Sequence, residues 1–181
     1  ALAKTIADST LTRSGVIRLM PPVAGRTTVR VAPDVLRALA GRTPMFPPAL
    51  TPAAALMPLG VGWGIAAQSR LTRGLTALRA QDVRWLLVTA DASAGVHDAL
   101  AVDRPTLAIN THLLASGLVE PLRIAARVAR LRRLWLLVRA TQRTWPMVER
   151  WARQASGPFI VEAPPGCRPH PRDDLRMVSA E

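Results

Sequence analysis

Cysteine, tyrosine and lysine are almost missing from this sequence. Cys167 is the single cysteine, which excludes an intrachain disulfide and any zinc site built from several cysteines, and makes a reducing cytoplasm the expected location. Tyrosine is absent and aromatic residues make up 4% of the chain, so leucine, valine and alanine must fill the core. The glycines at 60–64 lack the Gly-Lys-Ser/Thr of a Walker A motif, and the histidines follow no metal-binding spacing. We therefore predict neither a P-loop nor a metal site, and the residues leave any cofactor and any catalytic residue open.

Acidic residues are also scarce. The chain has 24 basic residues against 12 acidic ones and a formal net charge of +12, and Lys4 is its single lysine. A GC-rich coding bias explains the choice of arginine over lysine but not the excess of positive charge. Such an excess attracts phosphate-bearing or acidic partners over a long range, so we expect a nucleotide, a nucleic acid or an acidic protein surface as the partner.

Charge is missing altogether from residues 43–69, a stretch long enough to cross a bilayer. Its prolines argue against that, because proline leaves backbone groups unpaired in hydrocarbon; they stand at positions 44, 47, 48, 52 and 58. We expect no membrane contact, and we interpret the stretch as an ordered apolar loop or a partner-binding segment.

Three apolar runs indicate the fold class. The segments 83–91, 105–112 and 134–141 are rich in leucine, valine and isoleucine, stop abruptly at polar residues, and lie between segments of helical periodicity. Runs that are apolar throughout are typical of parallel strands covered by helices on both faces. The alternation predicts an α/β fold, a doubly wound and mostly parallel Rossmann-like sheet.

Domain limits and the remaining elements follow from the same patterns. We expect one domain over residues 1–163, a Pro/Gly-rich loop over 43–68 and an irregular C-terminal tail over 164–181. Strands are expected at about 15–20, 27–31 and 159–161, and helices at about 33–40, 69–81, 93–102, 118–132 and 145–155, the last capped by Thr144. Because the chain starts at Ala1 rather than Met, we expect a subunit or a fragment of a longer protein.

The carboxyl ends of the three runs predict a ligand crevice, because ligands of open α/β sheets bind outside those ends. Small residues and a helix start after Asp91 would favour a phosphate, although an ordinary helix cap explains them as well. Two guanidinium groups after the third run would clamp a phosphate or carboxylate, unless they simply belong to an exposed loop. The candidate phosphate- or nucleotide-binding residues are Asp91, Ser93, Gly95, Asn110, Thr111, His112, Arg139 and Arg143.

A second candidate is a row of arginines on the expected helix 118–132. Arg123, Arg127 and Arg130 recur at i, i+4 and i+7 and are extended by Arg132 and Arg133. Such a row neutralises nucleic-acid phosphates without reading bases. A solvated helix face is the alternative, but few acidic residues balance the row, which favours a nucleic-acid-binding role.

Residues 104–148 resemble a known family. The segment Arg104-Pro105-Thr106-Leu107-Ala108-Ile109-Asn110-Thr111-His112 followed by Leu134-Trp135-Leu136-Leu137-Val138 looks like the C-terminal region of the large kinase or ATPase components of BREX (phage-growth-limitation type) antiphage systems. The resemblance implies an accessory domain in a bacterial multidomain defence protein. Arg139-Ala140-Thr141 replaces the apolar-proline signature of that family, so the resemblance does not imply nucleotide hydrolysis.

Residues 88–105 carry a second resemblance. The segment from Val88 through Asp91-Ala92-Ser93-Ala94-Gly95 to Arg104-Pro105 is similar to the donor-binding segment of two-domain glycosyltransferases. This likeness implies a helix start that holds the phosphate of a nucleotide-linked donor.

These observations lead to one expected function and two alternatives. The expected function is a basic accessory domain or subunit that binds a nucleotide or nucleic acid, with a protein partner in a larger assembly. The alternatives are a nucleotide-sugar-dependent transferase domain and a non-catalytic protein-docking scaffold.

Overall fold

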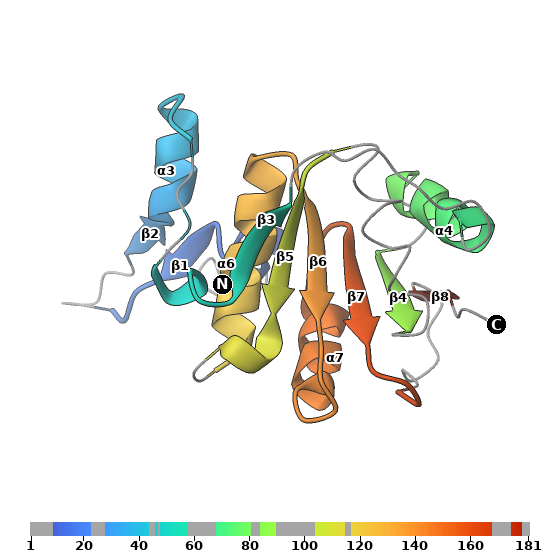
Figure 1. Ribbon diagram of the computed structural model, residues 1–181. Helices are drawn as coiled ribbons and strands as arrows, with labels where there is room; N and C mark the ends of the chain where they lie inside the picture. The colour runs from blue at the N-terminus through green and yellow to red at the C-terminus, as the bar shows by residue number, and fades with distance from the viewer. Residues whose placement is uncertain are drawn as a thin grey trace.

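A six-stranded sheet forms the centre of the computed structural model (Figure 1). The structure describes residues 9–22, 28–43, 46, 48–57, 68–80, 84–89, 104–114, 117–167 and 175–178. The strands are β3 (Ala54–Met57), β4 (Trp85–Thr89), β5 (Thr106–Asn110), β6 (Trp135–Arg139), β7 (Phe159–Ala163) and β8 (Leu175–Val178). Their spatial order is β3-β5-β6-β7-β4-β8; β3 is antiparallel to β5, and the other neighbouring pairs are parallel.

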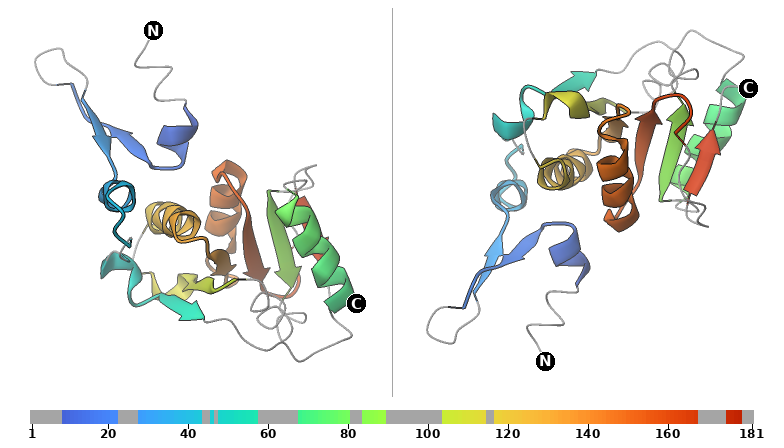
Figure 2. Two further views of the ribbon diagram at one scale, coloured as in Figure 1. Left: turned by 90° about the horizontal axis from the view of Figure 1, so that it is seen from above. Right: turned by 90° about the horizontal axis from the view of Figure 1, so that it is seen from below.

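Helices cover both faces of this sheet. On one face lie α6 (Val119–Leu131) and α7 (Trp145–Gln154), and on the other lies α4 (Gln68–Arg79), as Figure 2 shows. Alternate residues of each central strand enter opposite clusters: Leu136 packs with the α6 and α7 side chains, whereas Leu137 packs with those of α4. The predicted α/β class with a mostly parallel sheet is therefore confirmed, and the arrangement is compatible with a Rossmann-like fold.

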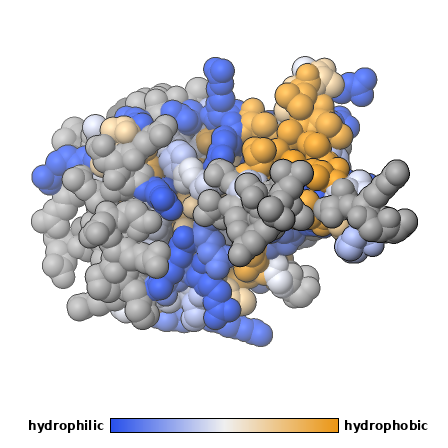
Figure 3. All heavy atoms as spheres, turned by 180° about the vertical axis from the view of Figure 1, so that it is seen from behind, coloured by the Kyte–Doolittle hydropathy of each residue, from blue (hydrophilic) through white to orange (hydrophobic). Residues whose placement is uncertain are grey.

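The N-terminal residues form a small unit beside α6. It consists of α2 (Thr10–Arg13), the antiparallel pair β1 (Ile17–Leu19) and β2 (Val29–Val31), and α3 (Pro33–Leu39), and it lies away from the strands of the main sheet (Figure 2). Leu36 and Leu39 of α3 are 53% and 79% exposed. In Figure 3, hydrophobic side chains gather over this part of the molecule. Exposed apolar patches of this kind mark contacts with other molecules.

Two segments expected to be irregular contain strands. In the stretch 43–68, Pro48–Leu50 forms a 3-10 turn, η1, and Ala54–Met57 forms β3. Leu50 is fully buried, because the prolines around it turn the chain so that it packs against α6 and brings β3 alongside β5. In the tail 164–181, Leu175–Val178 pairs in parallel with β4 as β8. The expectation of a loop and of an irregular tail is wrong at these residues.

The remaining expected elements agree with the structure within a few residues. The helix expected at 93–102 lies outside the described residues. No helix within the described ranges combines the length and the apolar character that crossing a membrane needs.

Candidate phosphate-binding surfaces

The sheet order decides which strand ends meet. Because β7 lies between β4 and β6, the ends of β5, β6 and β7 are neighbours, and Asn110, Arg139 and Glu162 are paired in register across them. The structure thus brings Asn110 and Arg139 together, as the sequence predicted. Asp91, Ser93 and Gly95 lie outside the described residues. The transferase-like segment 88–105 also falls largely outside them.

Arg139 already has an acidic partner at this edge. Its Nε lies 3.2 Å from Oε2 of Glu162, and the two side chains are 34% and 18% exposed. The ion pair balances the charge of Arg139, so an anion bound here would have to compete with a carboxylate. Sequence analysis missed Glu162, although its position at the end of the last apolar run was a signal for it.

Three threonines fix the loop between β6 and α7. The Oγ1 of Thr111, a buried residue, donates a 2.7 Å hydrogen bond to the carbonyl oxygen of Arg139 and shares another of 2.7 Å with Thr144 Oγ1. The backbone N–H of Thr141 donates to Thr144 Oγ1 at 2.9 Å. Thr144 therefore does not cap α7, because its hydroxyl is engaged with the loop. These bonds give Thr111 a structural role at this edge.

Beside this loop, Cys167 is buried under Gln142. Its Sγ lies 3.6 Å from Oε1 of Gln142. Burial raises the pKa of the Cys167 thiol above its ordinary value, and the negative charge of Glu149 raises it further. His112 and Arg143, by contrast, are exposed at the same edge. Within the described residues, no three His, Cys, Asp or Glu side chains form a group that could hold a metal ion.

The arginine row of α6 faces the N-terminal unit and α7. Arg127 is at its centre and is largely buried: Nε and Nη2 donate to the two carboxylate oxygens of Asp34 at 2.7 and 3.0 Å, and Nη1 donates to the carbonyl oxygen of Gly15 at 2.6 Å. This bidentate ion pair ties α3 and the start of β1 to α6. Arg127 therefore has a structural role in addition to its positive charge.

The two neighbours of Arg127 are more accessible. Arg123 is 34% exposed and pairs with Glu120 at 3.1 Å on the same helix. Arg130 is exposed and donates to the carbonyl oxygen of Ser156 at the end of α7. Gly157 has φ of 99°, which favours glycine, and a Cβ there would make the Arg130 guanidinium shift away from Ser156.

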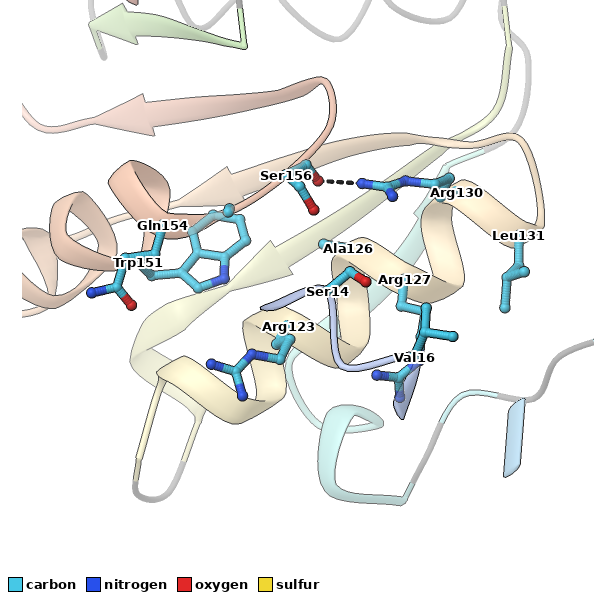
Figure 4. A pocket seen from close by; sticks show the side chains of 11 residues that line it. Ser14, Val16, Arg123, Ala126, Arg127, Arg130, Leu131, Trp151, Gln154 and Ser156 are labelled. Atoms are coloured by element: carbon cyan, nitrogen blue, oxygen red, sulfur yellow. Dashed lines mark hydrogen bonds between the residues drawn. The ribbon is translucent and has the colours of Figure 1, made fainter. Parts of the chain in front are cut away.

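Figure 4 shows a groove beside α6 and α7 that the arginine row lines. Arg123, Arg127 and Arg130 line it with Trp151 and Ser156, and its volume is about 70 Å³. The Ser156 hydroxyl is buried and has no hydrogen-bond partner. A buried polar atom of this kind calls for a water or ligand partner. The groove is therefore lined by three arginines and lies beside a buried polar group that has no partner.

Trp151 forms the floor of this groove and belongs to the core. It is 3% exposed, and its ring centroid lies 4.7 Å from that of Phe159. Trp145 is buried as well. Neither ring offers the open face that base stacking requires.

Arg132 and Arg133 follow the end of α6 and do not line the groove. The guanidinium of Arg132 lies 4.9 Å from the ring centroid of Phe46, and Arg133 is exposed with φ of 54°. They lie at the amino end of β6, whereas Arg139 and Arg143 lie at its carboxyl end. The arginines predicted from the sequence thus form three groups: one along the groove, one at the amino end of β6 and one at the carboxyl ends of the strands.

Positive charge dominates the described surface because the acidic residues are already engaged. Asp34, Glu120, Glu149 and Glu162 are the acidic residues of the described ranges, and each forms an ion pair with an arginine. Exposed arginines without a carboxylate partner in these ranges are Arg30, Arg37, Arg42, Arg133, Arg143 and Arg150. A ligand that meets this surface therefore finds uncompensated positive charge.

Comparison of the chain with known protein families, with curated proteins and with solved structures finds no match. The function must therefore be argued from the groove, the strand ends and the charge.

Proposed function

We propose that this chain is a single, doubly wound Rossmann-like α/β domain that binds the sugar-phosphate backbone of a nucleic acid and works as a non-catalytic accessory module in a larger assembly. The observation that carries the proposal is that Arg123, Arg127 and Arg130 line one groove together with an unpartnered Ser156 hydroxyl. Cationic side chains on one helix face neutralise successive phosphates, and this is the sequence-independent part of nucleic-acid binding.

The size and floor of the groove favour phosphate over base as the bound group. A volume of about 70 Å³ corresponds to roughly two water molecules, so a nucleobase does not fit, whereas oxygens of a phosphate can reach into it. The buried Trp151 leaves no stacking platform. Binding in the groove therefore recognises the backbone and is independent of sequence.

Arg123 and Arg130 supply the direct contacts with the phosphate, whereas Arg127 lines the groove without contacting the phosphate. The present partners of the two outer arginines are the half-exposed Glu120 carboxylate and the Ser156 carbonyl, which a phosphate replaces with charge-assisted hydrogen bonds. Arg127 keeps its buried pair with Asp34, so it lines the groove without adding net charge to it.

The exposed leucines of α3 support the assembly part of the proposal. Leu36 and Leu39 stand beside Arg37 and Arg42, and the nearest carboxylate on α3, Asp34, is buried and paired. The complementary surface is apolar and acidic, which describes a protein partner better than a nucleic acid.

The experiment that tests the binding function compares two double variants by fluorescence anisotropy. R123A/R130A removes the two contacts, and R73A/R84A removes two exposed arginines from other parts of the surface as a charge-matched control. The proposal predicts that R123A/R130A weakens binding equally for unrelated DNA sequences and lowers the salt slope by about one per arginine, whereas the control retains the wild-type slope. Equal losses in both variants would show that net charge alone, and not the groove, governs binding.

A further inference from the structure

A second and larger cavity lies on the other side of Arg127, between the N-terminal unit and α6. Its volume is about 320 Å³, at the lower end of the range typical of ligand pockets. Arg18 and Arg30 line it together with Arg127, Glu120 and the apolar side chains of Val31 and Ile124. The cavity thus combines a cationic rim with an apolar wall, and none of the functions considered above uses it.

The register of the N-terminal pair places like charges face to face. Arg18 of β1 and Arg30 of β2 are direct partners in the antiparallel ladder. Directly opposite side chains in such a ladder have Cβ atoms roughly 5 Å apart, and like charges there destabilise the pair. An anion between these two exposed arginines would therefore relieve the repulsion.

Glu120 is the carboxylate that lines the cavity, and Asp34 lies next to it; neither is free to pair with Arg30. Glu120 serves both Arg18 and Arg123, and Asp34 is held by Arg127. Arg30 has no carboxylate partner in the described part of the chain. Three guanidinium groups line the cavity with one carboxylate, and Asp34 pairs with Arg127 from outside the lining, so an added anion with one or two negative charges would offset the remaining positive charge.

We propose that this cavity binds a phosphate monoester, held between Arg18 and Arg30, with the organic part of the ligand against Val31 and Ile124. Guanidinium groups bind phosphate oxygens bidentately, and two of them on adjacent strands form a clamp. The monoester is either a free nucleotide or the terminal phosphate of a nucleic-acid strand. The inference rests on the proposed function only for the second source.

The first test uses R30Q, which removes the unpartnered charge but keeps a long polar side chain. Thermal unfolding is followed with increasing AMP, the ionic strength being held constant with sodium chloride. Without AMP, R30Q unfolds at the wild-type temperature or above it, because the cross-strand repulsion is gone. With AMP, the midpoint of the wild type rises, and R30Q needs at least about tenfold more AMP for the same rise, as expected for the loss of a hydrogen bond to a charged group.

R37Q is the matched control, because Arg37 is exposed on α3 but does not line the cavity. It should respond to AMP as the wild type does. R30Q should unfold at the wild-type temperature or above it without AMP, but below the wild-type temperature with AMP. This reversal separates ligand binding from a merely structural role. Absence of an AMP-specific rise in the wild type, or a rise in R30Q equal to that of the wild type, overturns the proposal.

The second test separates the two sources of the monoester. Oligonucleotides with a 5′-phosphate, a 3′-phosphate and no terminal phosphate are compared in binding to the wild type, R30Q and R123A/R130A. A preference for one phosphorylated end that R30Q abolishes identifies the strand terminus, and AMP binding without such a preference identifies a free nucleotide. Equal binding of all oligonucleotides, lost in R123A/R130A but kept in R30Q, together with no AMP response, refutes the cavity site and leaves the proposed function standing.

Discussion

The ion pair between Arg127 and Asp34 provides a sharp prediction about stability. R127M removes the guanidinium but keeps an unbranched side chain of comparable length in the same place. The substitution leaves the Asp34 carboxylate buried without its two hydrogen bonds, and it leaves the carbonyl oxygen of Gly15 without its donor. Both side chains of the pair are 9% exposed, so water replaces these bonds poorly.

The expected loss follows from this burial. Removal of one member of a buried ion pair costs about 3–5 kcal/mol, because the remaining charge is uncompensated. We therefore expect R127M and D34L each to lose about this much free energy of unfolding. The double variant R127M/D34L, which buries no charge, should lose clearly less than the sum of the two.

Urea denaturation of the two single variants and the double variant measures these values, and hydrogen exchange locates the change. Because Arg127 joins α6 to the N-terminal unit, faster exchange should concentrate in residues 15–39 before the central strands are affected. A loss below about 1 kcal/mol in R127M, or losses that add in the double variant, would refute the view that this pair holds the unit in place.

Three further predictions concern other parts of the surface. R139A/R143A tests the strand ends as a second phosphate site: the variant should remain folded by circular dichroism but bind phosphate ligands more weakly in anisotropy measurements. Unchanged affinity in the folded variant excludes these two residues from phosphate binding. Because its pKa is raised, Cys167 should react with a thiol reagent more slowly than free cysteine at neutral pH, and its rate should increase only at a higher pH than that of the free thiol; rapid reaction at pH 7 contradicts the burial of the thiol. L36S/L39S should keep its free energy of unfolding within about 0.5 kcal/mol in urea denaturation, since these side chains are exposed; an unfolded variant would mean that the leucines pack in the core.

The central strands could be predicted because both of their faces are buried. Leu136 and Leu137 point to opposite sides and yet both are apolar, so the run shows in the sequence without knowledge of its neighbours. The arginine row of α6 was visible for a similar reason, because the helical period is a local property of the chain.

Contacts between distant segments could not be predicted from local patterns. Asp34 and Arg127 are 93 residues apart, and no local periodicity relates them. The position of β7 between β4 and β6 depends on the directions of the crossovers, and it brings Glu162 next to Arg139. The short strands β3 and β8 lie at the sheet edges, where four residues give too little alternation to be recognised beside prolines and charges.

The measurement that tests the central claim most directly is the salt dependence of binding of the wild-type chain to a labelled single-stranded oligonucleotide. Backbone contacts from Arg123 and Arg130 predict that the logarithm of the binding constant falls linearly with the logarithm of salt concentration. Each phosphate contact contributes about −0.7 to the slope, so two contacts give a slope of about −1.4 or steeper. Affinity that is independent of salt, or absence of binding at low salt, would contradict a phosphate-binding function for this domain.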